Sequence, residues 1–437
     1  MDALIYALGV IAFFLGLLVS IALHEVGHMV PAKKFGVKVT QYFVGFGKTV
    51  WSFRRGETEY GIKAFPLGGY VKLVGMLPPD KSVDSAGNPV QRVRASNTGM
   101  FTQLISDARA AEYDNVLPGE EDRLFYRKPW WQKLIVMSGG PLVNVFIAIA
   151  LFSIVIMGFG LPKATTTVSA VSDCVIPATA KVQTCQAGDP VAPALQAGLK
   201  PGDVIRSFNG TPITSWGQLT GLIRDNNNGS AVIGISRGGR AMTLHTNTLV
   251  SSRPQLNDPS KDTRVGFLGV TPTEVNQRGN PLTVLSVMWD DTVATGAAIG
   301  HLPQKMVGVF QAAFGGKRDA NSPVSVVGAS RVAGEVVSQQ QASWSDRIGF
   351  VIGLLAALNL FVALFNFIPL LPLDGGHIAG ALWEAVRRGV ARLRSRPDPG
   401  YVDVAKMLPV AYAVAGVLMI MGVVLIYADI VNPVTLN

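Results

Sequence analysis

The sequence has few charged residues and very few cysteines, and both shortages narrow its class. Charged side chains make up 15% of the 437 residues, against about a quarter in ordinary soluble domains, whereas hydrophobic residues reach 49%. A soluble enzyme and a disordered chain are therefore poor matches. Two cysteines are too few for a disulfide scaffold. Together with a mean hydropathy of +0.33, this composition favours a membrane protein.

Patches of basic and aromatic residues in alternation, which are typical of nucleic-acid-binding proteins, are also missing. The net charge is +9, but the lysines and arginines lie beside apolar runs instead. We therefore expect contact with the lipid bilayer and no nucleic-acid partner.

Four apolar runs without a basic residue are each long enough to cross about 30 Å of hydrocarbon. They are residues 4–23, 134–161, 348–373 and 407–427. A cleaved signal peptide is an alternative for the first run, but Asp2 stands where such a peptide carries cations. Buried helices of a soluble domain are an alternative for the others. Their lengths favour four transmembrane helices.

The basic residues near these runs predict the topology, because cytoplasmic loops retain lysine and arginine. One cluster lies between the first two runs and another between the last two. Their members are Lys33, Lys34, Lys38, Arg123, Arg127, Lys128 and Lys133, and then Arg387, Arg388, Arg392, Arg394 and Arg396. This tally places both termini outside the cytoplasm, together with the large segment between the second and third runs.

The connecting segments differ in kind. Residues 37–75 form short alternating stretches broken by glycine, which predict hairpin-like β structure at the membrane. Residues 78–120 are polar and weakly patterned, and predict a surface insertion or a mobile loop. Residues 281–345 show helical spacing of apolar side chains, which predicts amphipathic helices near the outer surface.

The segment 192–210 predicts a short helix, a glycine turn, a strand and an Asn-Gly turn. It resembles the PDZ domains of bacterial membrane and periplasmic proteases, which bind a peptide as an added strand. A small β domain without a ligand is the alternative. Cys174 and Cys185 fall in the same extracytoplasmic segment, where they could form a disulfide or remain two buried thiols.

The strongest local signal is His24-Glu25-x-x-His28 at the end of the first apolar run. Residues four apart share one face of a helix, so both imidazoles can bind one cation while Glu25 reaches a water molecule on it. Zinc suits neutral imidazoles best. Ionisable groups are costly in hydrocarbon, which favours a metal site over histidines that only hydrogen-bond within a helix bundle.

A catalytic zinc site needs a third protein ligand, and Asp374 is the candidate. It lies in Asn366-x-x-Pro369-x-x-Pro372-Leu-Asp-Gly at the end of the third run, at a depth similar to that of the histidines. The prolines interrupt the helix, which is tolerable only beside protein or a wet cavity. A solvated aspartate at the start of the cytoplasmic loop is the alternative.

These motifs together resemble the site-2 protease family of intramembrane zinc metalloproteases, in particular its bacterial RseP-like (regulator of sigma-E protease) branch. The resemblance covers nearly the whole chain. Besides the two motifs above and the PDZ-like stretch, it depends on Gly45-Phe46-Gly47, on Pro66-Leu-Gly-Gly-Tyr-Val-Lys72 and on Gly140-Pro-x-x-Asn144.

The resemblance implies a role for each matching residue. His24, His28 and Asp374 would bind Zn²⁺, and Glu25 would be the general base. Substrate binding would fall to Asn366, Gly45, Phe46, Gly47 and Asn144, with Asn366 also placed to stabilise the oxyanion. The substrates implied are single-span membrane proteins such as anti-sigma factors, together with signal-peptide remnants, in regulated intramembrane proteolysis at the bacterial cell membrane.

The predicted fold class is a polytopic α-helical membrane protein with about four transmembrane helices, a membrane-associated β-hairpin region and one extracytoplasmic PDZ-like α/β domain. That domain would contact a peptide or the ectodomain of a substrate. The predicted segments are helix 1 (1–36), the re-entrant β region (37–76), a cytoplasmic loop (77–130), helix 2 (131–162), the PDZ-like domain (166–275), the extracytoplasmic amphipathic segment (276–346), helix 3 (347–376), a cytoplasmic loop (377–404) and helix 4 (405–430).

Three other functions share some of these features. Intramembrane histidines and an aspartate also line the ion pathways of metal transporters, but Glu25 and a peptide-binding module favour hydrolysis. A membrane chaperone or scaffold could keep an inactive site, which the complete His-Glu-x-x-His motif disfavours. Membrane zinc proteases that cut soluble loops usually take a glutamate as third ligand, unlike Asp374.

Overall fold

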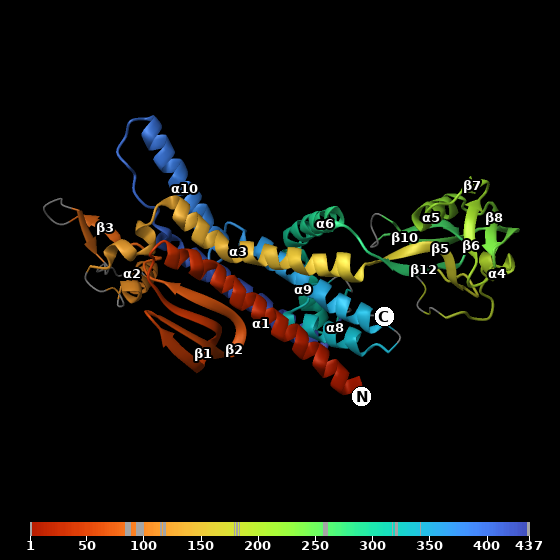
Figure 1. Cartoon of the computed structure of the whole chain (residues 1–437), viewed down its shortest axis with the longest axis horizontal. Helices are drawn as coiled ribbons and strands as arrows, with labels where there is room; N and C mark the ends of the chain where they lie inside the picture. The colour runs from red at the N-terminus through yellow and green to blue at the C-terminus, as the bar shows by residue number, and fades with distance from the viewer. Residues whose placement is uncertain are drawn as a thin grey trace. The chain divides into compact units, whose positions relative to one another are not determined.

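The computed structural model describes residues 2–83, 89–92, 100–113, 116, 119–178, 180, 182, 184–256, 261–316, 318–319, 322–340 and 342–434. The chain divides into two compact units (Figure 1). Unit 1 comprises Met1–Gly158 and Asn280–Asn437, and unit 2 comprises Phe159–Gly279. Unit 1 thus contains the predicted spans, and unit 2 contains the segment with the PDZ-like pattern.

Four long apolar helices dominate unit 1: α1 (Asp2–Lys34), α3 (Trp130–Ser153, continued by a π-helix Ile154–Phe159), α9 (Trp344–Asn366) and α11 (Leu408–Val431). In the described part of the chain, these four are long and apolar enough to cross a membrane. Only 11–28% of the apolar stretch of each is buried within the protein. Most of their side chains therefore face outward, as expected for contact with hydrocarbon. The four predicted spans are confirmed as helices.

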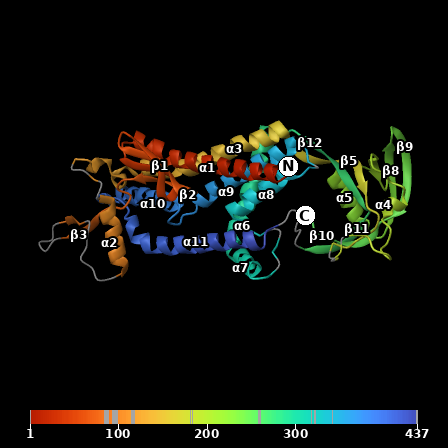
Figure 2. The same ribbon diagram turned by 90° about the horizontal axis from the view of Figure 1, so that it is seen from below.

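Helices α1 and α3 lie side by side and meet at glycines (Figure 2). A Cβ atom added to Gly27 would lie 2.5 Å from the carbonyl oxygen of Gly139, and one added to Gly139 would overlap the carbonyl oxygen of Gly27. The two backbones therefore touch, as small residues allow where membrane helices cross. Helix α9 also packs against α3.

The region after α1 is a long hairpin of two strands, β1 (Val39–Arg55) and β2 (Thr58–Leu73). Both strands bend, so that Phe43 of β1 pairs with Tyr70 and also with Gly61 of β2. The predicted β structure is therefore present, as two long strands instead of several short ones. In this pairing residues 65–73 of β2 have one strand neighbour, which leaves an edge beside α1.

The predicted loop at 78–120 contains ordered elements: strands β3 (Asp80–Val83) and β4 (Pro89–Arg92) and helix α2 (Met100–Tyr113). Arg109 of α2 forms an ion pair of 2.7 Å with Asp403, and Glu112 accepts a hydrogen bond from the Gly75 backbone. Polar side chains of this segment thus find partners far away in sequence. Residues 84–88, 93–99, 114–115 and 117–118 lie outside the described part of the chain.

The prediction for residues 347–404 differs from the structure. A single helical span was expected over 347–376, followed by a loop over 377–404. Instead α9 ends at Asn366, and a separate helix, α10 (Asp374–Leu393), occupies most of the second range. Pro369 and Pro372 explain the break, because proline removes a backbone donor and restricts the residue before it.

The predicted amphipathic segment 276–346 contains three helices in unit 1, namely α6 (Pro281–Gly300), α7 (Leu302–Ala313) and α8 (Val326–Ser338). Helix α6 packs against α3 and α9, and α8 packs against α1. A short 3-10 helix (Val404–Met407) leads into α11.

Unit 2 is an α/β domain around a sheet of order β12-β5-β6-β8-β9, with helix α5 (Trp216–Asp225) and a one-turn helix α4 (Pro193–Gln196). Its buried core includes Ile205, Phe208 and Leu219. Cys174 and Cys185 form a disulfide. The strands are β5 (Leu161–Val171), β6 (Val204–Phe208), β7 (Thr211–Pro212), β8 (Ser230–Arg237), β9 (Arg240–Asn247), β10 (Leu249–Pro254), β11 (Asp262–Phe267) and β12 (Val270–Gln277).

Candidate metal centre and substrate cavity

His24 and His28 lie one turn apart on α1, on the face that meets α3. Their exposed fractions are 9% and 6%. The helix runs without interruption from its apolar part through both histidines to Lys34, so its hydrogen-bonded backbone holds the two side chains in register. Two imidazoles are thus presented together inside the protein.

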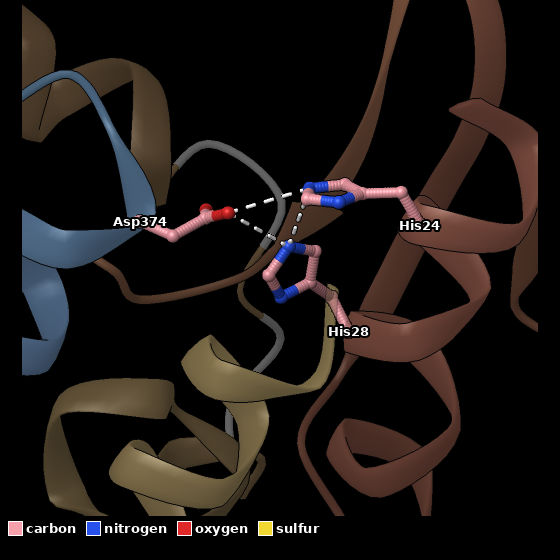
Figure 3. Close-up of side chains that lie close together, drawn as sticks. All are labelled: His24, His28 and Asp374. Carbon is pink, nitrogen blue, oxygen red and sulfur yellow. Dashed lines mark hydrogen bonds and ion pairs between the residues drawn. The ribbon is translucent and has the colours of Figure 1, made fainter. Parts of the chain in front are cut away.

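Asp374 completes a triangle with the two histidines (Figure 3). Its Oδ2 atom lies 3.3 Å from Nε2 of His24 and 3.3 Å from Nε2 of His28. The two Nε2 atoms are 3.2 Å apart. Donor atoms about 2.0–2.1 Å from a tetrahedral zinc ion are separated by about 3.3 Å. The three donors therefore have the spacing that zinc requires.

The partner of one ring nitrogen, in His28, also suits a metal site. Nδ1 of His28 lies 2.8 Å from the backbone oxygen of Val136. A carbonyl only accepts, so Nδ1 carries the proton and Nε2 has a free lone pair directed into the triangle. Nδ1 of His24 is buried without a hydrogen-bond partner among the described residues.

Gly140 of α3 makes room for the two imidazoles. A Cβ atom at this position would overlap Nε2 of His28 and lie 2.7 Å from Nε2 of His24. Pro141, the next residue, lacks the backbone N–H that would bond within the helix. Even an alanine at residue 140 would thus occupy the space in which the ligand atoms converge.

Glu25 lies beside the triangle, where two cavities meet. A larger cavity of ≈ 430 Å³ and a smaller one of ≈ 250 Å³ are both lined by His24, Glu25 and Asp374. The Glu25 carboxyl also lies near the backbone of Val71 in β2. A water molecule in either cavity would therefore have the Glu25 carboxyl and the candidate metal-binding groups within reach.

The larger cavity is lined by three asparagines, Asn144 of α3 and Asn359 and Asn366 of α9. Asn144 and Asn359 are buried, and the side-chain oxygen of each has no hydrogen-bond partner among the described residues. The amide nitrogen of Asn359 donates to Ser20 and to the Leu355 backbone. Uncompensated buried carbonyl oxygens are costly, which suits a cavity that receives backbone N–H groups.

The β hairpin brings Phe46, one of its three predicted substrate-binding residues, to the larger cavity. Gly68 and Gly69 of β2 line the larger cavity, together with Phe46 of β1. Gly45 and Gly47 are not among the residues that line it. The free edge of β2 and Phe46 of β1 thus adjoin the cavity that His24 and Asp374 also line.

The sequence did not predict a place at the site for three residues. They are Gly140, which makes room for the imidazoles, Asn359, and His377 of α10. His377 lines the smaller cavity three residues after Asp374, and withdrawal from water lowers its pKa although Asp374 opposes this shift. A histidine three positions from a ligand on a helix was a usable signal. The Gly139-Gly140 pair was visible, but its closeness to His28 was not.

Comparison with known proteins agrees with this geometry. Residues 12–408 match Peptidase family M50. The chain is 34% identical to zinc metalloprotease Rip1 of Mycobacterium tuberculosis over 447 residues, which cover 99% of this chain and 100% of that protein. It is 31% identical to Rip1 of Mycolicibacterium smegmatis (99% and 100% covered) and 27% identical to metalloprotease MmpA of Caulobacter vibrioides (85% of each).

The chain therefore belongs to peptidase family M50, the site-2 protease family. It is a membrane-embedded, zinc-dependent metalloprotease, as the resemblance in its motifs implied.

Proposed function

We propose that His24, His28 and Asp374 bind the catalytic zinc ion, and that Glu25 is the general base of an intramembrane endopeptidase. The observation that carries this proposal is the convergence of two imidazoles and one carboxylate, with donor atoms 3.2–3.3 Å apart, at the junction of two cavities. Enzymes that hydrolyse with a metal ion hold it with fixed side chains inside a partly closed cavity.

Zinc bound there would supply a Lewis acid that polarises a carbonyl and makes water more acidic. Glu25 takes a proton from the attacking water and returns it to the departing amine, as a single carboxylate can do on one side of the cleaved bond. The Asn366 amide, at the end of α9, donates to the carbonyl oxygen as negative charge develops.

A substrate must lose its helical hydrogen bonds before its carbonyls can react, because a helix satisfies them internally. The free edge of β2 at Gly68 and Gly69 offers backbone groups that could pair with the unwound segment. Asn144 offers a further acceptor in the same cavity. We propose single-span membrane proteins, such as anti-sigma factors and signal-peptide remnants, as substrates.

The proposed location is the bacterial cell membrane. The basic clusters of the loops support a metal site toward the cytoplasm, with both termini and unit 2 outside. We propose that unit 2 is a PDZ-like domain that contacts a peptide or the ectodomain of a substrate. One support is its sheet of order β12-β5-β6-β8-β9, with helix α5 packed against the core. The other is its disulfide, which suits an oxidising compartment.

The direct test measures zinc content and cleavage together, on purified protein with a single-span substrate. Glu25→Gln should retain zinc and lose cleavage, whereas His24→Ala and Asp374→Ala should lose both. Asn366→Ala should retain zinc and cleave more slowly. Normal cleavage by zinc-loaded Glu25→Gln would remove Glu25 from the catalytic role, and full zinc with normal turnover in Asp374→Ala would remove that residue from the ligand set.

A further inference from the structure

Helix α10 has an apolar face that the described residues of unit 1 leave exposed. At 3.6 residues per turn, five large side chains fall within an arc of about 100°. Each is solvent-accessible in the isolated chain. They are Leu382 (47% exposed), Trp383 (57%), Val386 (52%), Val390 (41%) and Leu393 (88%). We call this set the α10 apolar face.

The opposite face of α10 is fixed against α3. Glu384 forms an ion pair of 2.7 Å with Lys133 of α3, and the two side chains are only 2% and 8% exposed. Ala381 and Ala391 are buried on the same side. The helix therefore cannot rotate to bury its apolar face without breaking this buried pair, and that face remains outward.

Exposed arginines lie at the C-terminal end of α10, where Arg392 and Arg394 flank Leu393 in the sequence. Arg392, Arg394 and Arg396 are exposed, and none of them has an ion-pair partner in the part of the chain that the structure describes. Arg388 differs, because it pairs with Glu384 and with Asp398. An outward apolar stripe beside unpaired arginines is the pattern of helices that lie at the surface of an anionic bilayer.

Helix α10 lies between two candidate spans in the sequence. Helix α9, a candidate span, ends at Asn366, and the segment Val404–Val431 is another. Residues 367–373 precede α10, and an extended chain of that length reaches only about 25 Å. Yet α10 is not itself a candidate span. Its connections to two candidate spans favour a position of α10 at the bilayer interface.

We propose that the α10 apolar face and Arg392, Arg394 and Arg396 form a binding surface for anionic phospholipids. Trp383 and its neighbours would enter the boundary between headgroups and acyl chains, while the guanidinium groups bind lipid phosphates. This proposal is independent of the assignment of the zinc ligands. It states that burial of the α10 apolar face depends on anionic lipid.

The test uses the full chain with Val386→Cys, which gives a unique label position because both natural cysteines are in the disulfide. The nitroxide-labelled protein is placed in nanodiscs of phosphatidylcholine, alone or mixed with phosphatidylglycerol. Relaxation by oxygen, which concentrates in hydrocarbon, is compared with relaxation by a water-soluble nickel complex. Thr243→Cys, at an exposed position on β9 of unit 2, is the control.

We expect the label at residue 386 to become several-fold less accessible to nickel when phosphatidylglycerol is present. Replacing the three arginines by glutamine should abolish this change, and the label at 243 should stay accessible in both lipids. A label at residue 386 that is open to nickel in both lipids would overturn the proposal. A label that is shielded in both lipids would also overturn it, because the shielding would then not depend on anionic lipid. Shielding accompanied by dipolar broadening between labels would also overturn it, because a second copy would then cover the face. The lipid comparison in the unmutated background stands even if the triple variant does not fold.

Discussion

Unit 2 is held together by a conventional apolar core, whereas the metal centre of unit 1 depends on the near absence of side chains between helices. In unit 2, Ile205, Phe208, Leu219 and Ile233 fill the space between the sheet and α5. In unit 1, α1 and α3 touch through Gly27 and Gly139, and the imidazoles occupy the place that a side chain at residue 140 would take. Stability is organised differently in the two regions.

The difference indicates how each unit should respond to substitution. An apolar core loses free energy in proportion to the atoms removed, and neighbouring residues partly adjust. A centre assembled by contact of two backbones has no space to adjust, so one added methyl group displaces the ligands themselves. Changes in unit 1 should therefore affect zinc and activity first, and changes in unit 2 should affect local stability first.

The largest effect is expected for Gly140→Ala. The new Cβ atom would overlap Nε2 of His28, and displacement of a catalytic group by about 1 Å can cost about 100-fold in rate. Zinc content should fall in parallel. Gly353→Ala in α9, where an added Cβ meets nothing within 4 Å, should retain both zinc and cleavage. Normal zinc content in Gly140→Ala would show that the helices can separate without harm to the site.

The next effect concerns Glu384→Gln, which leaves Lys133 buried without its charged partner. Loss of one member of a buried ion pair costs about 3–5 kcal/mol. Because Asp374 begins the same helix, both the thermal midpoint in detergent and the zinc affinity should fall. Arg388→Gln, which removes a partly exposed partner of the same carboxylate, should cost less than about 1 kcal/mol. Unchanged zinc affinity in Glu384→Gln would separate α10 docking from ligand placement.

A smaller and local effect is expected in unit 2 for Asp203→Asn. The buried Asp203 carboxylate accepts bonds of 2.7 and 2.8 Å from Arg237 and one of 2.9 Å from the Lys200 backbone. Such charged hydrogen bonds contribute about 1.5–3 kcal/mol. Backbone amides of β6 and β8 should exchange faster with deuterium, while zinc content stays normal. Glu274→Gln, at an exposed position on β12, should leave exchange unchanged.

The same carboxylate predicts a pH dependence. The hydrogen bonds from Arg237 hold the pKa of Asp203 below its ordinary value, which is about 3.9 in an unfolded chain. Its stabilisation is thus fully present above pH of about 4 and is lost as the pH falls through the lower folded value. Asp203→Asn should remove this part of the acid sensitivity of unit 2. An identical acid response in the variant would assign that response to other groups.

The parts of this protein that were predictable depend on local pattern. Apolar length identified the four spans, because the bilayer imposes a minimum length on any helix that crosses it. Helical spacing brought His24 and His28 together, and chemistry selected Asp374 as their partner. These predictions required neither a packing angle nor a loop conformation.

The remaining features depend on contacts between distant segments. Lys133 and Glu384 are 251 residues apart, and neither has a pattern that indicates the other. The bend of the hairpin decided that Gly68 and Gly69 line the cavity while Gly45 and Gly47 do not. Most of helix α10 falls in residues 377–404, which were predicted to be a loop because they contain many charged residues. The apolar face of the helix became evident only from the exposed side chains in the structure.

The central claim is that His24, His28 and Asp374 share one zinc ion. X-ray absorption at the zinc edge tests it most directly, because the first shell reports ligand type and distance. We expect two imidazole nitrogens and oxygen ligands at about 2.0–2.2 Å, with one imidazole lost in a partly loaded His24→Ala sample. A first shell that contains sulfur, or that stays the same in His24→Ala and Asp374→Ala, would contradict it.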